Sequence, residues 1–466
     1  MNITFIGACR QITGSCYLLE SEDSRVVIDC GLYQERDYLG RNWKPFPFDP
    51  GDVDALILTH AHLDHSGLTP KFVRDGFKGK IYVTRPTADL IPIVLLDAAH
   101  IQEEDAAYKK KRHKKENRTG PYPEIPLYTK EDAEKSLLQI ESVPYKEKVD
   151  IGRDLSFRFF DAGHILGSSM VEMTFRSNGK ETTIVFSGDI GQMDKPLVKD
   201  PSFFDRADWI VMESLYGDRV HEDPMDIETM LQSIINQTVA SNGNILIPTF
   251  AIERAQEVMF YLNILVREDK IPYMMMFLDS PMAVNVTEVF KKHRQSLDRE
   301  AKVLFETGES PFSFPGLKLI RSVAESKAIN NIRGSCLIMA GSGMCTGGRI
   351  KHHLVHNIND PDATILFVGY QAHGTLGRLI LEGKESVRIH GRPYPVRARI
   401  EAIHGFSAHA DRNGLFQWVS HLTRGPKSVF LTHGDPEAAS ALASRLQKEK
   451  GWKTEIPEYL ATYRLT

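Results

Sequence analysis

The sequence predicts an α/β protein in which one α/β domain is inserted into another domain, and three observations support this. Short apolar strands that end in acidic or histidine side chains fill the first part of the chain. Strands and helices then alternate from about residue 215, which is typical of an open, largely parallel sheet. From about residue 396 the strand-and-histidine pattern returns. We therefore expect one domain formed by residues 1–213 and 396–466, and an inserted domain formed by residues 214–395.

Composition and charge place few limits on function. The chain has 466 residues, enough for roughly three average domains, with 42% hydrophobic and 25% charged residues and a net charge of -4. A polyanion would therefore have to be bound by local positive patches or by metal ions. Scattered cysteines without a CxxC pair favour a reducing cytosol: Cys9, Cys16, Cys30, Cys336 and Cys345. Residues 1–6 resemble a strand rather than a signal peptide, and no apolar run approaches the roughly 18 residues of a membrane span, so we expect a cytoplasmic protein without a membrane contact.

A cluster of ligand-type side chains follows the apolar run at residues 55–59. This run is predicted to be a strand buried on both faces, and functional groups are often displayed on the loop after such a strand. His60 and His62 point to the same side if the chain is extended, and a turn then brings Asp64 and His65 to a neighbouring position. Imidazoles with a carboxylate suit zinc, with manganese or iron as competitors. The alternative is a polar loop whose histidines contact solvent.

Other apolar strands deliver polar side chains in the same way. Strand 25–30 has Asp29 near its end, strand 155–160 precedes His164, strand 184–186 precedes Asp189, and strand 209–212 precedes Glu213. Taken alone, His164 could be a partly buried histidine and Asp189 a turn residue. Because the same layout recurs, we interpret these residues as a functional set.

The inserted domain is predicted from strands at 244–248, 273–278, 336–340 and 364–368 and helices at 251–267, 284–293 and 349–356. Beyond it, strand 398–403 leads to His409 and strand 428–431 leads to His433. Asp435 and Pro436 then suit the cap and first turn of a helix that ends near residue 449.

Two further features have alternative interpretations. A helix expected from residue 86 leads into seven consecutive basic-type residues from Lys109 to Lys115, which form either a solvated helix face or mobile loop, or a contact with a phosphate backbone. The glycine-rich segment 341–343 could be a dinucleotide loop, but its glycine spacing is wrong for one. We expect instead that its backbone and the next helix receive a substrate phosphate, with these candidates: Ser342, Gly343, Arg349 and Arg378.

The ordered motifs resemble a known family. Residues 60–65 match the HxHxDH signature of the metallo-β-lactamase superfamily, and Asp29, His164 and Asp189 follow in the order of its other motifs. Glu213, residues 405–411 (Gly-Phe-Ser-Ala-His-Ala-Asp) and residues 431–435 (Leu-Thr-His-Gly-Asp) resemble the three motifs of its β-CASP branch of nucleic-acid-cleaving enzymes. That branch includes RNase J and the endonuclease of the eukaryotic cleavage and polyadenylation complex. The resemblance implies a metallo-β-lactamase αββα sandwich with an inserted β-CASP domain of parallel-sheet α/β type.

The resemblance also implies a dinuclear site with two Zn²⁺ ions, for which Mn²⁺ or iron could substitute. One metal would be held by His60, His62 and His164, the second by Asp64, His65 and His433, and Asp189 would bridge them. Asp29 would orient a ligand histidine, His409 would act as general acid, and Glu213 would orient His409. Two metal ions can share a hydroxide and neutralise charge on a phosphoryl transition state, so Asp64 counts among the catalytic residues.

We therefore expect a zinc-dependent ribonuclease that cuts single-stranded RNA, as an endonuclease, in a cleft between the two domains. The resemblance favours RNA over DNA, because the DNA-repair branch of the family typically lacks a histidine at the motif that contains His433. The alternatives are a hydrolase of a small ester, thioester or lactone, and a non-catalytic RNA-binding paralogue. A homodimer is possible.

Overall fold

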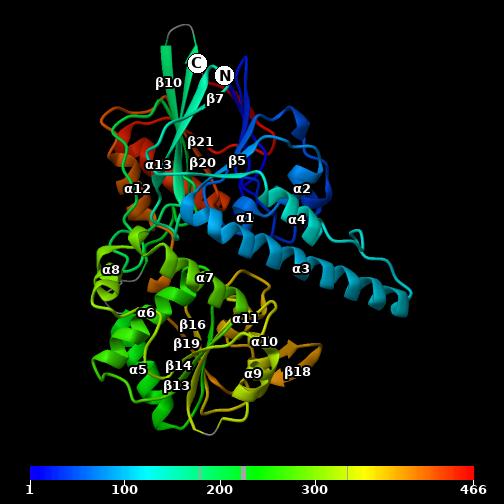
Figure 1. The fold of residues 1–466 in the computed structure, drawn as a ribbon, viewed down its shortest axis with the longest axis vertical. Helices are drawn as coiled ribbons and strands as arrows, with labels where there is room; N and C mark the ends of the chain where they lie inside the picture. Colours follow the sequence, from blue (N-terminus) through cyan, green and yellow to red (C-terminus); the bar gives the residue numbers. More distant parts are fainter. Residues whose placement is uncertain (178–179, 222–226, 333, 466) are drawn as a thin grey trace. The chain divides into compact units, whose positions relative to one another are not determined.

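The computed structural model describes residues 1–177, 180–221, 227–332 and 334–465 and divides the chain into two compact units (Figure 1). The first unit contains Met1–Met193, Asp200–Val220 and His409–Thr466. The second contains Asp194–Lys199 and His221–Ala408.

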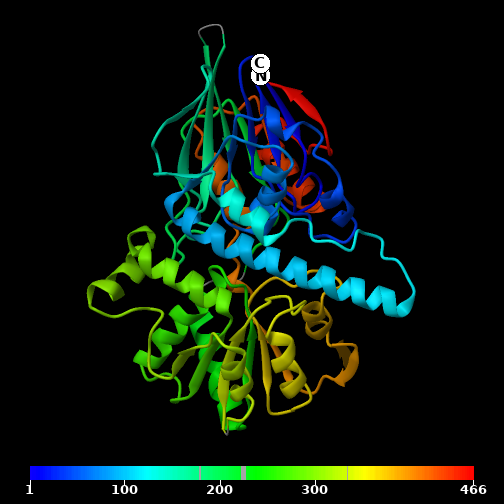
Figure 2. The ribbon, with the colours of Figure 1, turned by 45° about the vertical axis from the view of Figure 1, so that its right-hand side comes forward.

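The first unit is built on two seven-stranded sheets. In the first sheet the order is β22-β1-β2-β3-β4-β5-β6, in which β3 to β6 run parallel and the pairs β22–β1, β1–β2 and β2–β3 are antiparallel. The last strand of the chain therefore pairs with the first, and the two termini lie close together (Figure 2). Its strands are β1 (Asn2–Phe5), β2 (Tyr17–Glu20), β3 (Arg25–Ile28), β4 (Ala55–Ile57), β5 (Lys80–Thr84), β6 (Ile140–Val143) and β22 (Thr462–Arg464).

The second sheet of this unit has the order β21-β20-β11-β10-β9-β8-β7. Strands β10, β11, β20 and β21 run parallel, so their carboxyl ends lie at one edge of the sheet. The strands are β7 (Val149–Ile151), β8 (Leu155–Asp161), β9 (Ser169–Ser177), β10 (Lys180–Phe186), β11 (Trp209–Glu213), β20 (Ser428–Thr432) and β21 (Thr454–Glu455).

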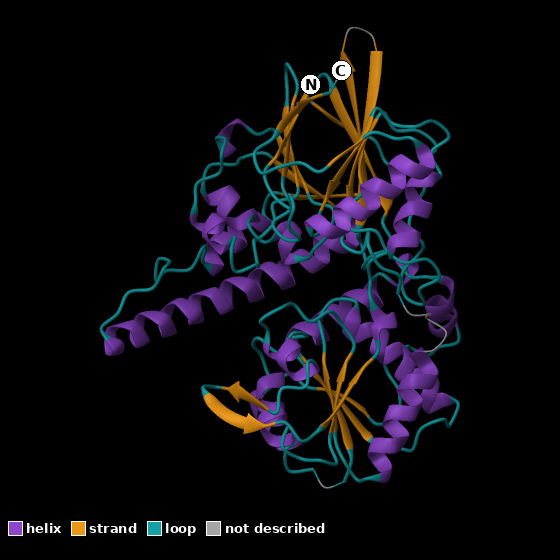
Figure 3. Ribbon diagram, turned by 180° about the vertical axis from the view of Figure 1, so that it is seen from behind, coloured by secondary structure: helices purple, strands orange, loops and turns teal. Residues whose placement is uncertain are grey.

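An apolar core joins the two sheets, and helices cover their outer faces (Figure 3). Phe5 of the first sheet lies 5.0 Å, centroid to centroid, from Phe430 of the second, and both rings are buried. The helices on the side of the first sheet are α1 (Leu63–Ser66), α2 (Thr69–Arg74), α3 (Arg85–Glu116) and α4 (Lys130–Leu137). Those on the second are α12 (Arg412–Ser420) and α13 (Pro436–Lys450). The predicted αββα sandwich is confirmed.

The second unit is an open sheet of six strands with helices around it. Its order is β14-β13-β15-β12-β16-β19, and every neighbouring pair is parallel, which confirms the predicted sheet type. The strands are β12 (Ile245–Pro248), β13 (Met275–Asp279), β14 (Leu317–Leu319), β15 (Cys336–Ala340), β16 (Thr364–Phe367) and β19 (Arg399–Ala402). The helices are α5 (Ile227–Ala240), α6 (Arg254–Arg267), α7 (Pro281–Lys292), α8 (Arg299–Glu306), α9 (Val323–Ile329), α10 (Ile350–Asn357) and α11 (Leu376–Leu381), and β17 (Ser386–Ile389) with β18 (Arg392–Pro395) forms a hairpin.

Two elements differ from expectation in their extent or placement. We expected the chain to return to the first domain at residue 396, but β19 pairs with β16 in the second unit, and the compact units place the return at His409. Helix α3 continues through the lysine run to Glu116, so this run is helical rather than a loop. Although α3 has 32 residues, neither it nor any other described helix is long and apolar enough to cross a membrane.

Candidate active site and metal centre

The candidate ligands gather in the first unit, on the segments that follow the carboxyl ends of its strands. His60 and His62 follow β4, His164 follows β8, Asp189 follows β10 and His433 follows β20. Asp64 and His65 lie in the short helix α1 rather than in a simple turn, and His62 is the residue that precedes this helix. The structure thus brings together all seven residues that the sequence predicts as ligands, from positions as far apart as 60 and 433.

Four of these side chains form a first cluster. His62 Nδ1 lies 3.1 Å from His60 Nε2 and 3.2 Å from His164 Nε2. Asp189 Oδ2 lies 3.4 Å from the Nε2 atoms of both His60 and His164. The four ligand atoms therefore surround one point.

A second cluster lies on the other side of the Asp189 carboxylate. Its members Asp64, His65 and His433 place one ligand atom each within 4.8 Å of one another. Asp189 Oδ1 lies 3.1 Å from His65 Nε2 and 3.6 Å from His433 Nε2. One oxygen of Asp189 thus faces each cluster.

The first cluster fits a divalent cation. Ligands about 2.0–2.1 Å from a tetrahedral ion lie about 3.3 Å from one another, close to the observed 3.1, 3.2 and 3.4 Å. Hydrogen bonds explain the arrangement less well, because the single Nδ1 of His62 approaches two imidazole nitrogens. Imidazole and carboxylate ligands suit zinc, iron and manganese.

The protonation of three of these side chains, His60, His433 and Asp189, suits cation binding. Burial lowers the pKa of His60 far below its usual value and that of His433 to about 3, so both imidazoles are neutral at pH 7. Burial would raise the pKa of Asp189, but His433, His65 and His60 outweigh this effect and hold it well below its usual value. Neutral imidazoles and an ionised carboxylate are the forms that bind metal.

Asp29, predicted to orient a ligand histidine, lies behind the clusters and is fully buried. Its Oδ2 is 2.7 Å from His65 Nδ1, and its Oδ1 accepts a hydrogen bond from the Thr59 N–H at 2.7 Å. Thr59 Oγ1 donates to Asp29 Oδ2 at 2.9 Å and lies 3.0 Å from His60 Nδ1. Asp29 therefore contacts His65 directly and His60 through Thr59, which leaves the Nε2 atoms of both histidines directed into the clusters.

Gly31 allows α1 to lie against the Asp29 loop. A Cβ at this position would be 1.7 Å from the Asp64 carbonyl oxygen, a distance that no side chain can adopt. The neighbouring Cys30 N–H donates to the His65 carbonyl at 2.7 Å. The close approach of the two backbones thus fixes the positions of Asp64 and His65.

His409 and Glu213 form a pair beside the clusters. His409 Nδ1 lies 3.1 Å from Glu213 Oε2, and the other carboxylate oxygen accepts the N–H of Ile190, next to Asp189. The His409 ring lies 4.4 Å from the His164 ring, and its side chain is 19% exposed, whereas Glu213 is buried. Burial alone would lower the pKa of His409, but the Glu213 carboxylate outweighs it and the pKa rises to about 8.

Two polar residues of the site were not predicted. Thr59 immediately precedes the histidine cluster, so its position was a signal that could have been used. Ser15 belongs to none of the motifs, yet its Oγ lies 3.4 Å from His65 Nε2 and 3.5 Å from His433 Nδ1.

The predicted phosphate-binding residues lie in the second unit, and their side chains have internal partners. Arg349 donates to Asp279 Oδ1 at 2.6 Å and to the Arg321 carbonyl at 2.8 Å, and Arg378 donates to Glu382 at 2.7 Å. Ser342 Oγ accepts the N–H of Gly347 at 3.2 Å, within the loop that also holds Gly343. Their contact with a phosphate stays a prediction.

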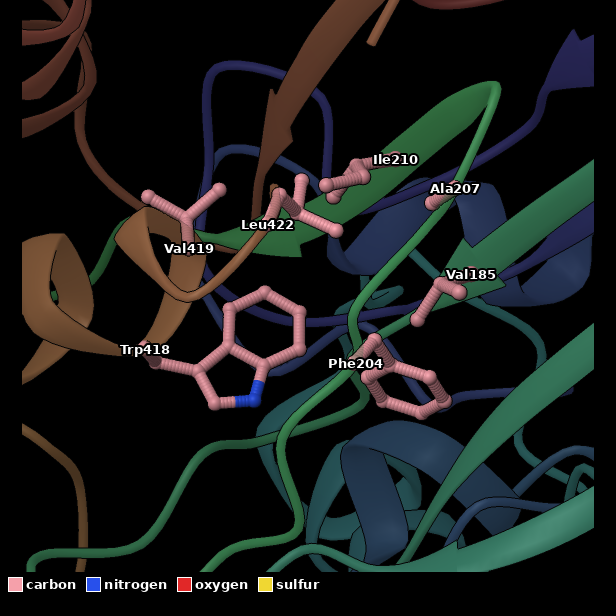
Figure 4. Close-up of a pocket in the computed structure, with 7 residues that line it drawn as sticks. All are labelled: Val185, Phe204, Ala207, Ile210, Trp418, Val419 and Leu422. Atoms are coloured by element: carbon pink, nitrogen blue, oxygen red, sulfur yellow. The ribbon is translucent and has the colours of Figure 1, made fainter. Parts of the chain in front are cut away.

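A small apolar pocket of the first unit is distinct from these clusters (Figure 4). It lies where α12 and the segment after it face β10 and β11, and Trp418 and Phe204 form one side of it. Its remaining lining residues are Val185, Ala207, Ile210, Val419 and Leu422. A purely aliphatic and aromatic lining is part of the core and offers no catalytic group.

Three family models match successive parts of the chain. Residues 10–216 match the metallo-beta-lactamase superfamily, residues 255–380 the Beta-Casp domain, and residues 393–457 the Zn-dependent metallo-hydrolase RNA specificity domain. The third match includes both His409 and His433.

Similar proteins extend over nearly the whole chain. A ribonuclease of Thermus thermophilus is 38% identical over 446 residues, covering 96% of each chain. The transcription termination factor FttA of Methanosarcina mazei is 33% identical over 481 residues, covering 100% of this chain and 72% of that protein. An RNase J-like protein of Methanocaldococcus jannaschii is 30% identical over 462 residues, covering 98% of this chain and 97% of that one.

A crystal structure of a protein of unknown function from Enterococcus faecalis shares the fold, with a TM-score of 0.55, 13% identity and coverage of 100% of this chain and 99% of that one. The family models, the relatives and the His/Asp clusters agree with the resemblance inferred from the sequence motifs. The chain belongs to the β-CASP family of the metallo-β-lactamase superfamily, whose ribonucleases are metal-dependent hydrolases.

Proposed function

We propose that this metal-dependent ribonuclease cuts single-stranded RNA internally and that it uses two zinc ions. The observation that carries the proposal is the Asp189 carboxylate, with one oxygen 3.4 Å from His60 and His164 and the other 3.1 Å from His65. A carboxylate with one oxygen directed at each of two ligand clusters suits a pair of ions and not a single one.

In this proposal His60, His62 and His164 would hold one ion, Asp64, His65 and His433 would hold the second, and Asp189 would serve both. Bound ions would supply a nucleophilic water at neutral pH and neutralise charge on the phosphate during in-line displacement. Asp29 keeps the Nε2 atoms of His60 and His65 directed inward, through the contacts at 2.7 Å and through Thr59.

His409 donates a proton to the leaving oxygen of the RNA. The contact with Glu213 engages its Nδ1, so the proton at Nε2 is the one available to the substrate. Glu213 positions this ring and stabilises its positive charge. The hydrogen bond from Ile190 holds Glu213 in turn and connects it to the loop of Asp189.

RNA is supported as the substrate by the RNA specificity model over residues 393–457 and by the names of the Thermus and Methanocaldococcus relatives. The five cysteines are free and buried thiols, which supports a cytoplasmic location. A homodimer stays a proposal that light scattering of the purified protein would test.

The test combines metal analysis with a panel of substrates. The purified protein should contain about two zinc ions per chain and should cut single-stranded RNA, including a covalently closed RNA circle, which has no end for an exonuclease. Duplex RNA, single-stranded DNA and a chromogenic thioester or lactam complete the panel. A protein that degrades linear RNA but leaves the circle intact would refute internal cutting, and turnover of the thioester alone would replace RNA as the substrate.

Single substitutions test the roles proposed for His409 and Asp64. His409→Ala should lower kcat by about 10²–10⁴-fold, the usual contribution of general acid–base catalysis, without loss of zinc. Asp64→Ala should lower both activity and metal content. His100→Ala is the matched control, because His100 is an exposed histidine of the same unit, 3.6 Å from Glu104. If His409→Ala behaves like His100→Ala, the assignment of the general acid is wrong.

A further inference from the structure

The C-terminal part of α3 concentrates positive charge in an otherwise acidic chain. Residues 109–118 contain five lysines and two arginines with a single acidic residue, Glu116, whereas the whole chain has a net charge of -4. In Figures 1 and 3 this half of the helix extends away from the rest of the first unit. Such a local excess of charge is a candidate surface for a polyanion.

Four of these charges form no ion pair with the residues that the structure describes. Lys109 lies 3.9 Å from Asp105, and Arg112 and Arg118 lie 2.8 and 2.7 Å from Glu116. For the other four lysines, which are all exposed, the part of the chain that the structure describes provides no ion pair: Lys110, Lys111, Lys114 and Lys115. We call these four residues the lysine patch.

Two of the four patch lysines lie on the helix face turned away from its buried side, and the other two, Lys110 and Lys114, lie between these two faces. Ala106 is buried, and His113 lies on the same face, with its Nδ1 2.5 Å from Glu124 of the loop that follows the helix. At 100° per residue, Tyr108, Lys111 and Lys115 lie on the opposite face, three and four residues apart. The Tyr108 side chain on this face is 65% exposed.

The other end of α3 is attached to the candidate active site. The Oγ1 atoms of Thr84 and Thr87 donate hydrogen bonds to the Gly167 carbonyl at 2.6 and 2.8 Å, in the loop that holds His164. From Thr87 to the patch the helix rises by about 1.5 Å per residue, which gives about 34–42 Å. One continuous helix therefore links the ligand clusters to the lysine patch.

We propose that the lysine patch with Tyr108 binds the part of a long RNA that extends beyond the cleavage site. The inference rests on the proposed action on single-stranded RNA. Lysines attract backbone phosphates. The exposed aromatic ring beside them offers a surface on which any of the four bases can stack. A stacked strand rises by roughly 3.4 Å per nucleotide, so an RNA needs at least about twelve nucleotides on that side of the cut to reach from the cleavage site to the far end of the patch.

A purely structural role for the patch makes a different prediction. Lysines in the last turns of a helix also stabilise its negative C-terminal end. In that case their removal changes the stability of α3 and leaves RNA affinity unaltered.

The test variant replaces all four patch lysines by glutamine, which has a similar helix propensity. The matched control replaces four exposed lysines of the same unit that already have acidic partners, so that the net charge changes equally: Lys130, Lys135, Lys148 and Lys453. Both are compared in KM and kcat on RNAs of about 6 and about 40 nucleotides, lengths on either side of the reach estimated above. Kd is measured by fluorescence anisotropy at several salt concentrations in the zinc-loaded His409→Ala background.

We expect the patch variant to raise KM and Kd for the long RNA by about tenfold at low salt, and to flatten the salt dependence of log Kd by about 0.7 for each lost phosphate contact. The short RNA and kcat should stay within about twofold of the parent, because the short RNA does not reach the patch. The loss on the long RNA should be the same for any base sequence, because the lysines contact phosphates and stacking on Tyr108 accepts any base. Tyr108→Ala should weaken long-RNA binding about fivefold, and Tyr108→Phe should not.

Long-RNA affinity and salt dependence equal to those of the control variant would overturn the inference, as would an equal loss on short and long RNA. A failure of the proposed function is distinguishable, because it would show as an unsubstituted protein that cuts no RNA. The anisotropy measurement does not depend on cleavage and still decides whether the patch binds RNA.

Discussion

The most quantitative prediction concerns a buried ionic network in the second unit, probed by Glu257→Gln. Glu257 Oε1 accepts a hydrogen bond from Lys195 at 2.9 Å, and its Oε2 accepts one from Arg254 at 2.5 Å. The three side chains are 4%, 6% and 8% exposed, respectively. Glutamine keeps the shape of the side chain but leaves two buried cations without their shared negative charge.

The size of the effect follows from the geometry. At 2.9 Å and an effective dielectric constant of about 20, one such pair contributes about 6 kcal/mol of Coulomb energy. Desolvation and relaxation reduce this, and removal of one partner from a buried pair typically costs about 3–5 kcal/mol. We therefore expect Glu257→Gln to destabilise the second unit by about 3–5 kcal/mol.

The assay must separate the two units. All four tryptophans, Trp43, Trp209, Trp418 and Trp452, belong to the first unit, so their fluorescence during urea unfolding reports on that unit alone. Hydrogen exchange of peptides from β12 and β15 reports on the second unit. The variant should lose protection in those peptides, whereas the tryptophan transition should keep its midpoint.

The stability of the Glu257→Gln variant should also depend on pH, in a direction set by the pKa of Lys195. Burial lowers the pKa of Lys195, and the carboxylate of Glu257 opposes this effect. Without Glu257 the pKa of Lys195 falls further below the value of an unfolded lysine. Between these two pKa values the unfolded chain binds more protons, so the stability of the variant should rise with pH and its deficit should shrink.

The control is Glu268→Gln, which breaks a 2.6 Å contact with Lys270 at a carboxylate that is 52% exposed. An exposed pair contributes at most about 1 kcal/mol. If Glu257→Gln costs no more than this control, the reasoning about the buried network is wrong. Lys195 also donates to the Gly405 carbonyl at 2.8 Å, four positions before His409 in the chain.

Three further predictions address the candidate site and the sheet of the second unit. Removal of metal by a chelator should lower the free energy of unfolding reported by tryptophan fluorescence, by about 2.7 kcal/mol when the free metal concentration had been 100 times its Kd. An unchanged fluorescence melting curve would contradict a metal site in the first unit. Gly31→Ala should displace α1 and lower zinc content, since its Cβ would be 1.7 Å from the Asp64 carbonyl oxygen; Gly347→Ala, whose Cβ meets no atom within 4 Å, is the control, and equal zinc contents would refute the reasoning. Burial would raise the pKa of Asp279, but hydrogen bonds from His353, Ser326 and Arg349 outweigh it and hold the pKa below its usual value. The stability that Asp279 contributes should therefore be complete above its unfolded pKa of about 4 and be lost as pH falls through its folded pKa; circular dichroism melts of Asp279→Asn should lack this acid-dependent step.

The candidate ligands could be found because they obey a local rule, and the resemblance to the family then implied their roles. Each ligand follows an apolar strand, and strand ends can be recognised from a few neighbouring residues. The parallel sheet of the second unit was predictable for the same reason, since strands and helices alternate along the chain. The fold class and the candidate ligands therefore required no knowledge of distant contacts.

The features that escaped prediction depend on pairing across long sequence separations. Strand β19 is followed by histidines, as β20 is, and only its pairing with β16 places it in the second unit. Ser15 approaches His433 across 418 positions, and Lys195 meets Glu257 across 62. No local periodicity encodes such contacts, so a segment boundary and several supporting residues could not be assigned from sequence.

The order of strands explains why the ligands converge despite this separation. Asp189, Glu213 and His433 lie at or just beyond the ends of β10, β11 and β20, three neighbouring parallel strands. At about 4.8 Å per strand, the backbones of β10 and β20 are roughly 10 Å apart. The side chains of Asp189 and His433 close this gap to 3.6 Å.

Glu213 ends the strand between them and pairs with His409 instead of joining the clusters. The outer two of these three parallel strands thus place candidate metal ligands, and the middle strand places the partner of the proposed general acid. A register slip of β11 by one residue would turn Glu213 to the opposite face and release His409, while the outer strands kept their ligands. The register of β11 therefore decides whether the proposed acid is held beside the candidate metal centre.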